Sequence, residues 1–127
     1  RCSMMLGKHL KKGPIYDILN KKDLFISEDS RLQMITTNEI ANIILFLLKQ
    51  KIENTIYNVG GIGAVNFKNI ANYISLPAAF SQDAEKQEYE INVAKLHTVY
   101  QLKTSGEYLK TYIRHCESVL KLAKQSR

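Results

Sequence analysis

The chain has 127 residues, 45% of them hydrophobic, and this length and composition fit one globular domain or a piece of one. No apolar run approaches the roughly 20 residues of a membrane-spanning helix, so we expect no membrane partner. No signal peptide opens the sequence and the two cysteines lie near opposite ends, which predicts free thiols in a cytoplasmic protein. The sequence starts with an arginine inside an apolar run, which we interpret as the start of a fragment.

The net charge of +6 is concentrated at the two ends of the chain. Residues 1–22 carry six lysines and arginines against one aspartate, and residues 103–127 carry six against two glutamates. Basic ends of this kind can contact nucleic acid or another polyanion, but they also keep a small domain soluble. Because no aromatic-interleaved RNA-binding motif accompanies them, we do not expect nucleic acid as a partner.

In the N-terminal third, short strand signals alternate with one helix signal. The run 1–6 (RCSMML) is typical of a buried strand, and 13–22 predicts a short helix because Pro14 is favoured in a first turn. Two further apolar runs, 24–27 and 31–35, are separated by the turn-like sequence EDS and predict short strands.

The clearest helix signal covers residues 36–51. Thr36 precedes Glu39 by three positions, which is the spacing of a capping box. The apolar residues then recur at helical spacing, at Ile40, Ile43, Ile44, Leu47 and Leu48. A strand is predicted at 54–59, and Asn66 is expected to cap a further helix that runs to about residue 74.

The glycines between these last two elements resemble the start of a dinucleotide-binding turn. Gly61 and Gly63 satisfy two places of the Gly-x-Gly-x-x-Gly fingerprint, whereas Asn66 stands in the third. An acidic residue that could hold a ribose is expected about 20 positions on, but that region, 81–88, is polar and predicts a loop. We therefore expect these glycines to be structural rather than cofactor-binding.

The C-terminal third predicts a strand at 89–92, a helix over 93–102 and a long final helix. Thr104 and Glu107 form a second capping box ahead of the final helix. The apolar stripe of that helix consists of Leu109, Ile113, Cys116 and Leu120. The whole sequence therefore predicts an α/β fold in which short strands alternate with helices.

Self-contained catalytic and metal-binding patterns are missing from the sequence. None of the seven tyrosines is followed four positions later by a lysine, the spacing at which a lysine can lower a phenol pKa on a helix. The three histidines are scattered, and no Cys-x-x-Cys pair exists. The sequence therefore predicts no catalytic residue and no metal site.

Four segments stand out by their order and spacing: RCSMMLG, DSRLQMITTNEIANII, TIYNVGGIGAVNFKNIANYI and INVAKL. Together they resemble the C-terminal, substrate-binding part of the NAD-dependent epimerase/dehydratase family, the extended short-chain dehydrogenases that act on nucleotide sugars. The resemblance implies a single substrate-binding domain or fragment over residues 1–127. Within it, residues 1–7 would be the last Rossmann-type strand, and residues 8–127 the substrate-binding region with C-terminal helices.

In this family the nicotinamide cofactor, the catalytic Ser or Thr and the Tyr-x-x-x-Lys pair lie on an N-terminal Rossmann domain. The resemblance therefore implies a parent enzyme that uses NAD or NADP, with that domain absent from this chain. It further implies that the chain alone binds no cofactor and is inactive. The nucleotide-sugar substrate would be bound together with the missing Rossmann domain, in a homo-oligomer.

The resemblance also implies which residues meet the substrate. Ser3 and Met4 would lie at the end of the last Rossmann-type strand, near the nicotinamide and the sugar ring. Lys8, Lys11 and Lys12 would lie on the segment that leaves this strand, beside the nucleotide part of the substrate.

A second group of implied substrate contacts lies in the next matching segment. Arg31 matches an arginine that approaches the substrate's phosphates in related enzymes, and Gln33, two residues on, would point to the same face of a strand. The alternative for Arg31 is a solvated surface arginine. Thr36, Asn38 and Glu39 replace the family's common histidine and acidic pair. Because these positions cap and orient a helix, we expect the changes to be structural.

Two hypotheses for the function remain. In the first, the chain is the substrate-binding portion of an NAD(P)-dependent nucleotide-sugar epimerase, dehydratase or reductase. In the second, it is a stand-alone basic module that binds a phosphate-rich partner without catalysis.

Overall fold

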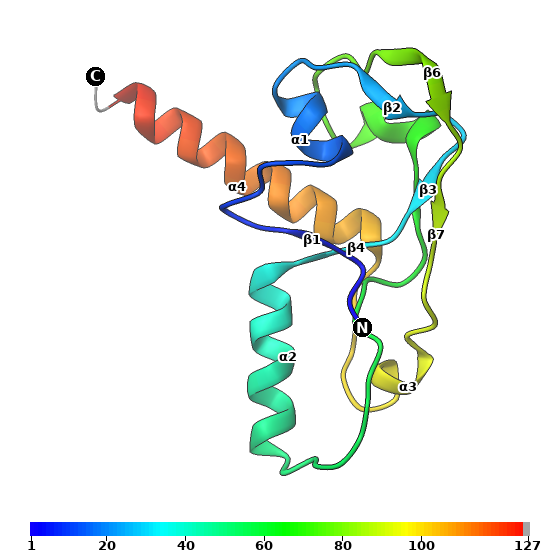
Figure 1. The fold of residues 1–127 in the computed structure, drawn as a ribbon. Helices are drawn as coiled ribbons and strands as arrows, with labels where there is room; N and C mark the ends of the chain where they lie inside the picture. Colours follow the sequence, from blue (N-terminus) through cyan, green and yellow to red (C-terminus); the bar gives the residue numbers. More distant parts are fainter. Residues whose placement is uncertain (126–127) are drawn as a thin grey trace.

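The computed structural model describes residues 1–125, with side chains through residue 118. It is a mixed α/β fold in which all described strands are short (Figure 1). The elements in chain order are β1 (Met4–Leu6), α1 (Pro14–Leu19), β2 (Leu24–Ile26), β3 (Arg31–Leu32), β4 (Met34–Thr36), α2 (Thr37–Lys49), β5 (Val65–Asn66), the 3-10 helix η1 (Phe67–Asn72), β6 (Phe80–Glu85), β7 (Glu88–Tyr89), α3 (Ala94–His97) and α4 (Ser105–Gln125).

The strands form three small sheets. β1 and β4 are a parallel pair in the middle of the molecule, with Leu6 opposite Thr36, so their carboxyl ends meet at one edge (Figure 1). A second parallel pair joins β2 to β6. The third sheet has the order β5-β3-β7, with β5 antiparallel and β7 parallel to β3.

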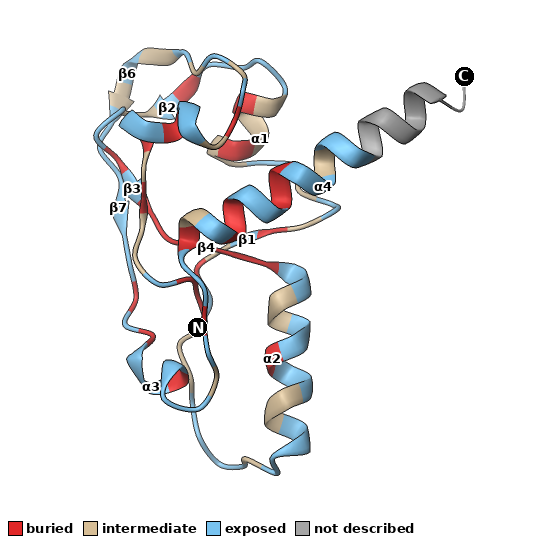
Figure 2. Cartoon of the chain, turned by 180° about the vertical axis from the view of Figure 1, so that it is seen from behind, coloured by how far each residue is buried: buried red, intermediate tan, exposed pale blue. Residues whose placement is uncertain are grey.

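Strand β4 separates two hydrophobic clusters, because neighbouring side chains of a strand point to opposite faces. Met34 is fully buried in a cluster that includes residues of α1, η1 and α4, whereas Ile35 is fully buried in a cluster that includes residues of α2 and α3. Figure 2 shows the buried residues gathered where β1 and β4 lie against α4. The parallel pair of β1 and β4 therefore packs against a hydrophobic cluster on each of its two faces.

Helix α2 carries an apolar face that the described chain leaves exposed. Thr36 caps the helix, and its side chain accepts a hydrogen bond from the Glu39 amide at 3.2 Å, as the sequence predicted. Exposure is 54% at Ile44, 55% at Leu45 and 68% at Leu48. Figure 2 accordingly shows α2 as mostly exposed or intermediate. None of the described helices combines the length and the hydropathy that a membrane span requires.

The sequence predicted the N-terminal strand, the helix at Pro14, α2 and the start of α4 correctly. The capping role of Asn66 is also confirmed, since its side chain accepts from the Lys68 amide at 3.0 Å, although the helix that follows is a 3-10 helix. In the apolar stripe of α4, Leu109 and Ile113 are buried. Leu120 lies outside the residues whose side chains are described.

Several predicted elements were wrong in extent or type; the strand predicted at 89–92, for example, overlaps β7 only at Tyr89. The strand predicted at 31–35 is divided at Gln33 into β3 and β4. The predicted loop at 81–88 contains most of β6, a strand of largely polar residues that is held by backbone pairing with β2. The strand predicted at 54–59 is reduced to one bridge between Val59 and Cys2. The helix predicted over 93–102 is only α3, because the chain turns so that the Leu102 amide donates to His97 Nδ1 at 3.2 Å.

Candidate functional site

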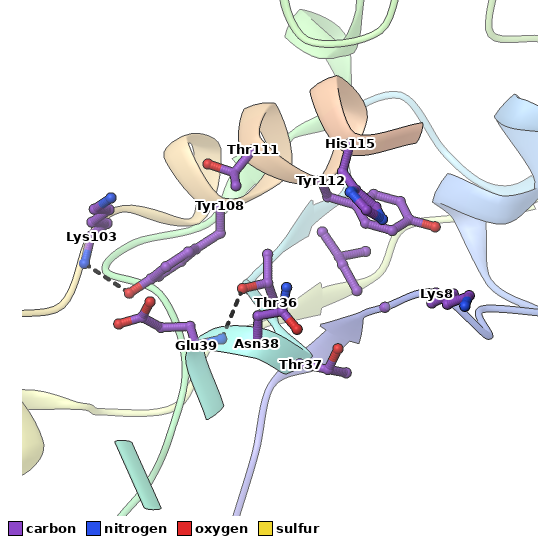
Figure 3. A pocket seen from close by; sticks show the side chains of 12 residues that line it. Lys8, Thr36, Thr37, Asn38, Glu39, Lys103, Tyr108, Thr111, Tyr112 and His115 are labelled. Atoms are coloured by element: carbon purple, nitrogen blue, oxygen red, sulfur yellow. Dashed lines mark hydrogen bonds between the residues drawn. The ribbon is translucent and has the colours of Figure 1, made fainter. Parts of the chain in front are cut away.

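A cavity of about 370 Å³ opens at the carboxyl ends of β1 and β4 (Figure 3). Its walls are the loop after β1, the first turn of α2 and one side of α4. Ligands of open parallel α/β sheets bind beyond the carboxyl ends of the strands, and small-molecule sites commonly measure about 300–1,000 Å³. Position and size therefore make this cavity the candidate binding site.

One end of the cavity is lined by Lys8, Tyr112 and His115, and Figure 3 shows the Tyr112 ring and His115 on the side nearer Lys8. Tyr112 is only 8% exposed, and its hydroxyl forms a hydrogen bond with the Cys116 thiol. Burial, together with the neighbouring Cys116 thiol, raises the pKa of Tyr112 to about 12. The phenol therefore stays protonated near neutral pH.

The other end of the cavity is organised by Glu39 and two phenols. The Tyr100 hydroxyl donates to the Glu39 carboxylate, and burial together with this bond raises the pKa of Tyr100 to about 12. The Tyr108 hydroxyl accepts from the Lys103 amide at 3.1 Å, and burial raises its pKa as well. Both phenols therefore stay protonated near neutral pH, and neither can act as a base. At this end of the cavity their hydroxyl groups hold Glu39 and the Lys103 backbone in place.

The glycines after Val59 hold the backbone close to this site. A Cβ at Gly61 would lie 2.5 Å from the Met34 carbonyl oxygen and 2.7 Å from the Ser105 amide nitrogen, so only glycine fits between β4 and α4. Gly63 adopts a φ of +71°, a conformation that favours glycine. Ser105 Oγ donates to the Gly63 carbonyl at 2.7 Å and accepts from the Met34 amide at 3.0 Å. The structural role that the sequence predicted for the glycines is confirmed.

Ser3 and Gln33 lie together in the interior, beside Gly60. Gln33 is 1% exposed, and its Nε2 donates to the carbonyls of Gly61 at 2.8 Å and Ile91 at 3.1 Å. Its Oε1 accepts from the Ile91 amide at 2.9 Å. Any contact between Gln33 and a substrate would compete with these three bonds, which tie β3 and β4 to the chain after β7.

The buried Ser3 differs from Gln33 in having no partner. Ser3 is buried, with only 5% of its surface exposed, yet its hydroxyl makes no hydrogen bond in the part of the chain that the structure describes. Met4, the next predicted contact, is half-buried and packs against the larger hydrophobic cluster. Neither residue lines the cavity.

Arg31 lies apart from the cavity, on β3. Its Nη1 is 3.6 Å from Glu88 Oε1, and both side chains are about half-exposed. Lys86 Nζ is also 3.6 Å from Glu88, so one carboxylate serves two cations. Of the seven predicted substrate contacts, only Lys8 lines the cavity; Lys11 and Lys12 lie with it along a shallower hollow beside the same loop.

Sequence reasoning missed Tyr112 and His115 as binding candidates, because the tyrosines were tested only for a lysine four positions on and the histidines only for metal-ligand spacing. Their separation by three residues was the available signal, since residues three apart share a helix face. No group of three potential metal ligands occurs among the described residues.

No family model and no curated protein sequence matches this chain. Solved structures do match: a UDP-galactose 4-epimerase has a TM-score of 0.68 and 20% identity, over 94% of this chain and 45% of that one. The Bordetella bronchiseptica enzyme WbmG, in complex with NAD and UDP, has a TM-score of 0.62 and 16% identity, over 90% and 41%. A UDP-N-acetylglucosamine 4-epimerase from Bacillus cereus has 0.55 and 14%, over 88% and 41%. The chain spans less than half the length of these structures. It has the fold of one part of a sugar-nucleotide epimerase, as the sequence resemblance predicted.

Proposed function

We propose that this chain is the substrate-binding part of an NAD(P)-dependent nucleotide-sugar epimerase, dehydratase or reductase, and that it is inactive alone. The observation that carries the proposal is the fold match, which covers nearly all of this chain but under half of the UDP-galactose 4-epimerase. Among the matching structures, WbmG was solved with NAD and UDP, and RMD from Pseudomonas aeruginosa with NADPH. We assign the cofactor and the proton-transfer residues to a Rossmann domain outside this chain.

The exposed apolar side chains support a missing partner domain. Ile44, Leu45 and Leu48 on α2 are more than half exposed, and Met5 on β1 is 50% exposed. Exposed apolar side chains grouped on one helix face commonly mark a contact surface. A second domain packed against α2 and β1 would bury them.

Within this proposal, Arg31 binds the substrate's phosphates. Its guanidinium is half-exposed and already holds a carboxylate, Glu88, at 3.6 Å, so a phosphate could replace a partner of the same charge. Loss of a hydrogen bond to a charged group costs about 1.5–3 kcal/mol, which corresponds to about 10- to 150-fold weaker binding.

The test is titration of the chain with UDP, followed by backbone amide NMR shifts, in Arg31→Ala and Lys86→Ala. Both substitutions remove one cation from Glu88, so Lys86→Ala is a matched control. We expect Arg31→Ala alone to weaken UDP binding by at least about tenfold. If UDP causes no shifts in the unsubstituted chain, the proposal is rejected. If UDP binds equally well to both variants, Arg31 is removed from the site.

If the chain is instead a stand-alone basic module, we expect a different pattern of binding. Its binding would follow charge, so UDP, pyrophosphate and longer polyanions would compete according to their charge, and salt would weaken all of them. Tighter binding of UDP than of pyrophosphate, retained at raised salt, would instead favour the nucleotide-sugar assignment.

A further inference from the structure

The chain from β6 through β7 is one extended segment that runs along the outside of the molecule (Figure 1, Figure 2). Alternate residues of this segment pair inward: the carbonyls of Glu85, Gln87 and Tyr89 accept from the amides of Ser27, Arg31 and Gln33 at 2.9, 2.9 and 3.1 Å. Because backbone groups alternate in direction along a strand, the N–H and C=O groups of the even-numbered residues point to the opposite side. Residues 84–90 therefore present an open strand edge, which we call the outer edge.

The outer edge has no partner in the part of the chain that the structure describes. No backbone hydrogen bond there involves the N–H or C=O of Lys86, Glu88 or Glu90, and all three residues are exposed. An open edge of this kind is a template for a further strand. From the order of charges along it, we propose that the outer edge pairs, antiparallel and centred on Gln87, with the outer edge of a second copy of this chain.

The charges favour a second copy because the segment is complementary to itself. Antiparallel pairing about Gln87 places Lys86 directly across from Glu88 of the second copy, and Glu88 across from Lys86 of the second copy. Both residues have outward-pointing backbone groups, so each such pair also exchanges two backbone hydrogen bonds. Opposite charges directly across an antiparallel pair attract, and the two-fold symmetry gives this attraction twice.

The same charges oppose the neighbouring registers. Pairing about Lys86 would set two lysines against each other, and pairing about Glu85 or Glu88 would set two glutamates against each other. Pairing about Tyr89 would place Glu88 across from Glu90. Like charges directly opposite destabilise a strand pair, so the register about Gln87 is the one that the sequence of charges selects.

The charged side chains of the outer edge are free to turn toward a second copy. Glu88 lies 3.6 Å from both Arg31 Nη1 and Lys86 Nζ, and all three side chains are about half-exposed. Exposed ion pairs of this kind contribute little to stability, so exchanging them for pairs between copies costs little. A single strand edge is smaller than a standard interface, and we therefore expect a weak dimer that depends on concentration.

The test measures sedimentation equilibrium of the chain carrying Leu48→Glu, which removes the exposed apolar contact of α2 from the measurement. We expect this chain to form dimers at concentrations up to about 1 mM. Lys86→Glu and Glu88→Lys, each added to it, should weaken the dimer about tenfold or more, because each places like charges across both pairs. Mixed in equal amounts, the two variants should dimerise again, because each copy supplies the charge that the other needs.

Lys12→Glu and Glu53→Lys are the matched controls, since they make the same charge changes at exposed positions outside the outer edge. Each should leave the dimer unchanged, and mixing them should strengthen nothing. Amide hydrogen exchange gives a second readout. The amides of Lys86 and Glu88 should be protected only at high concentration, whereas that of Gln87, which donates to Ser30 Oγ at 2.9 Å, should be protected at every concentration.

Three results would overturn the inference: a folded chain that stays monomeric at about 1 mM, a dimer that Lys86→Glu and Glu88→Lys leave intact, or a mixture of these variants that associates no better than either alone. The inference goes beyond the proposed function and does not depend on it. Dimers formed through the outer edge by a chain that UDP does not shift would support the inference and reject the proposed function. UDP binding by a chain that stays monomeric would do the reverse.

Discussion

Replacement of Gln33 tests whether this residue holds the fold together or contacts substrate. Gln33→Ala removes three hydrogen bonds to the backbone of Gly61 and Ile91, at 2.8, 3.1 and 2.9 Å, from a site that is 1% exposed. Each bond contributes about 1 kcal/mol net, and the buried groups left unpaired add to the loss. We therefore expect the free energy of unfolding to fall by about 3–5 kcal/mol and the melting temperature by roughly 10 °C or more.

Urea denaturation followed by circular dichroism measures this loss, with Gln101→Ala as the control. Gln101 is exposed, and substitutions at such positions usually change stability by less than about 0.5 kcal/mol. Gln33→Glu keeps the side-chain size but removes the donor to both carbonyls, so it should also destabilise, and less at low pH, where a protonated carboxyl can donate. The reasoning is refuted if Gln33→Ala unfolds like Gln101→Ala while its UDP binding falls.

Further predictions concern packing, exposed surface and pH. Gly61→Ala should lower the free energy of unfolding by several kcal/mol, because its Cβ would meet backbone atoms within 2.7 Å. At Gly63 a Cβ would meet open space, so Gly63→Ala should lower it only by the roughly 1–2 kcal/mol that a left-handed backbone costs. Thermal melting curves of the two variants measure the difference. Leu48→Glu should reduce self-association of the chain in sedimentation velocity, and Lys49→Glu should not; a monomeric unsubstituted chain would contradict this. Tyr100 keeps its proton in the folded state, with a pKa of about 12 against 10.0 ordinarily, so its contribution is complete below pH 10 and is lost as the pH rises from about 10 to 12. The urea midpoint should therefore fall less between about pH 10 and pH 12 in Tyr100→Phe than in the unsubstituted chain.

Local signals in the sequence were sufficient for elements whose ends are fixed by nearby residues. Thr36 and Thr104 cap their helices through Glu39 and Glu107, and these bonds span only three positions. Pro14 similarly starts α1. Such contacts are encoded within one turn, so spacing alone reveals them.

Contacts between distant parts of the chain could not be predicted in the same way. Gln33, which lies between β3 and β4, bonds to Ile91, 58 positions away, and β6 is a strand because its backbone pairs with β2. The resemblance supplied Lys8 as a site candidate, but Tyr112 and His115 became candidates only when α4 was seen beside the ends of β1 and β4. Side chains that meet across a fold leave little periodic signal in the sequence.

Calorimetric titration of the chain with UDP and, separately, with NAD tests the central claim most directly. If the chain is the substrate-binding part of a nucleotide-sugar enzyme, UDP should bind and NAD should give no heat beyond dilution. Micromolar NAD binding would contradict the assignment of the cofactor to another domain. A chain that unfolds cooperatively yet binds UDP more weakly than about 10 mM would contradict the substrate-binding role itself.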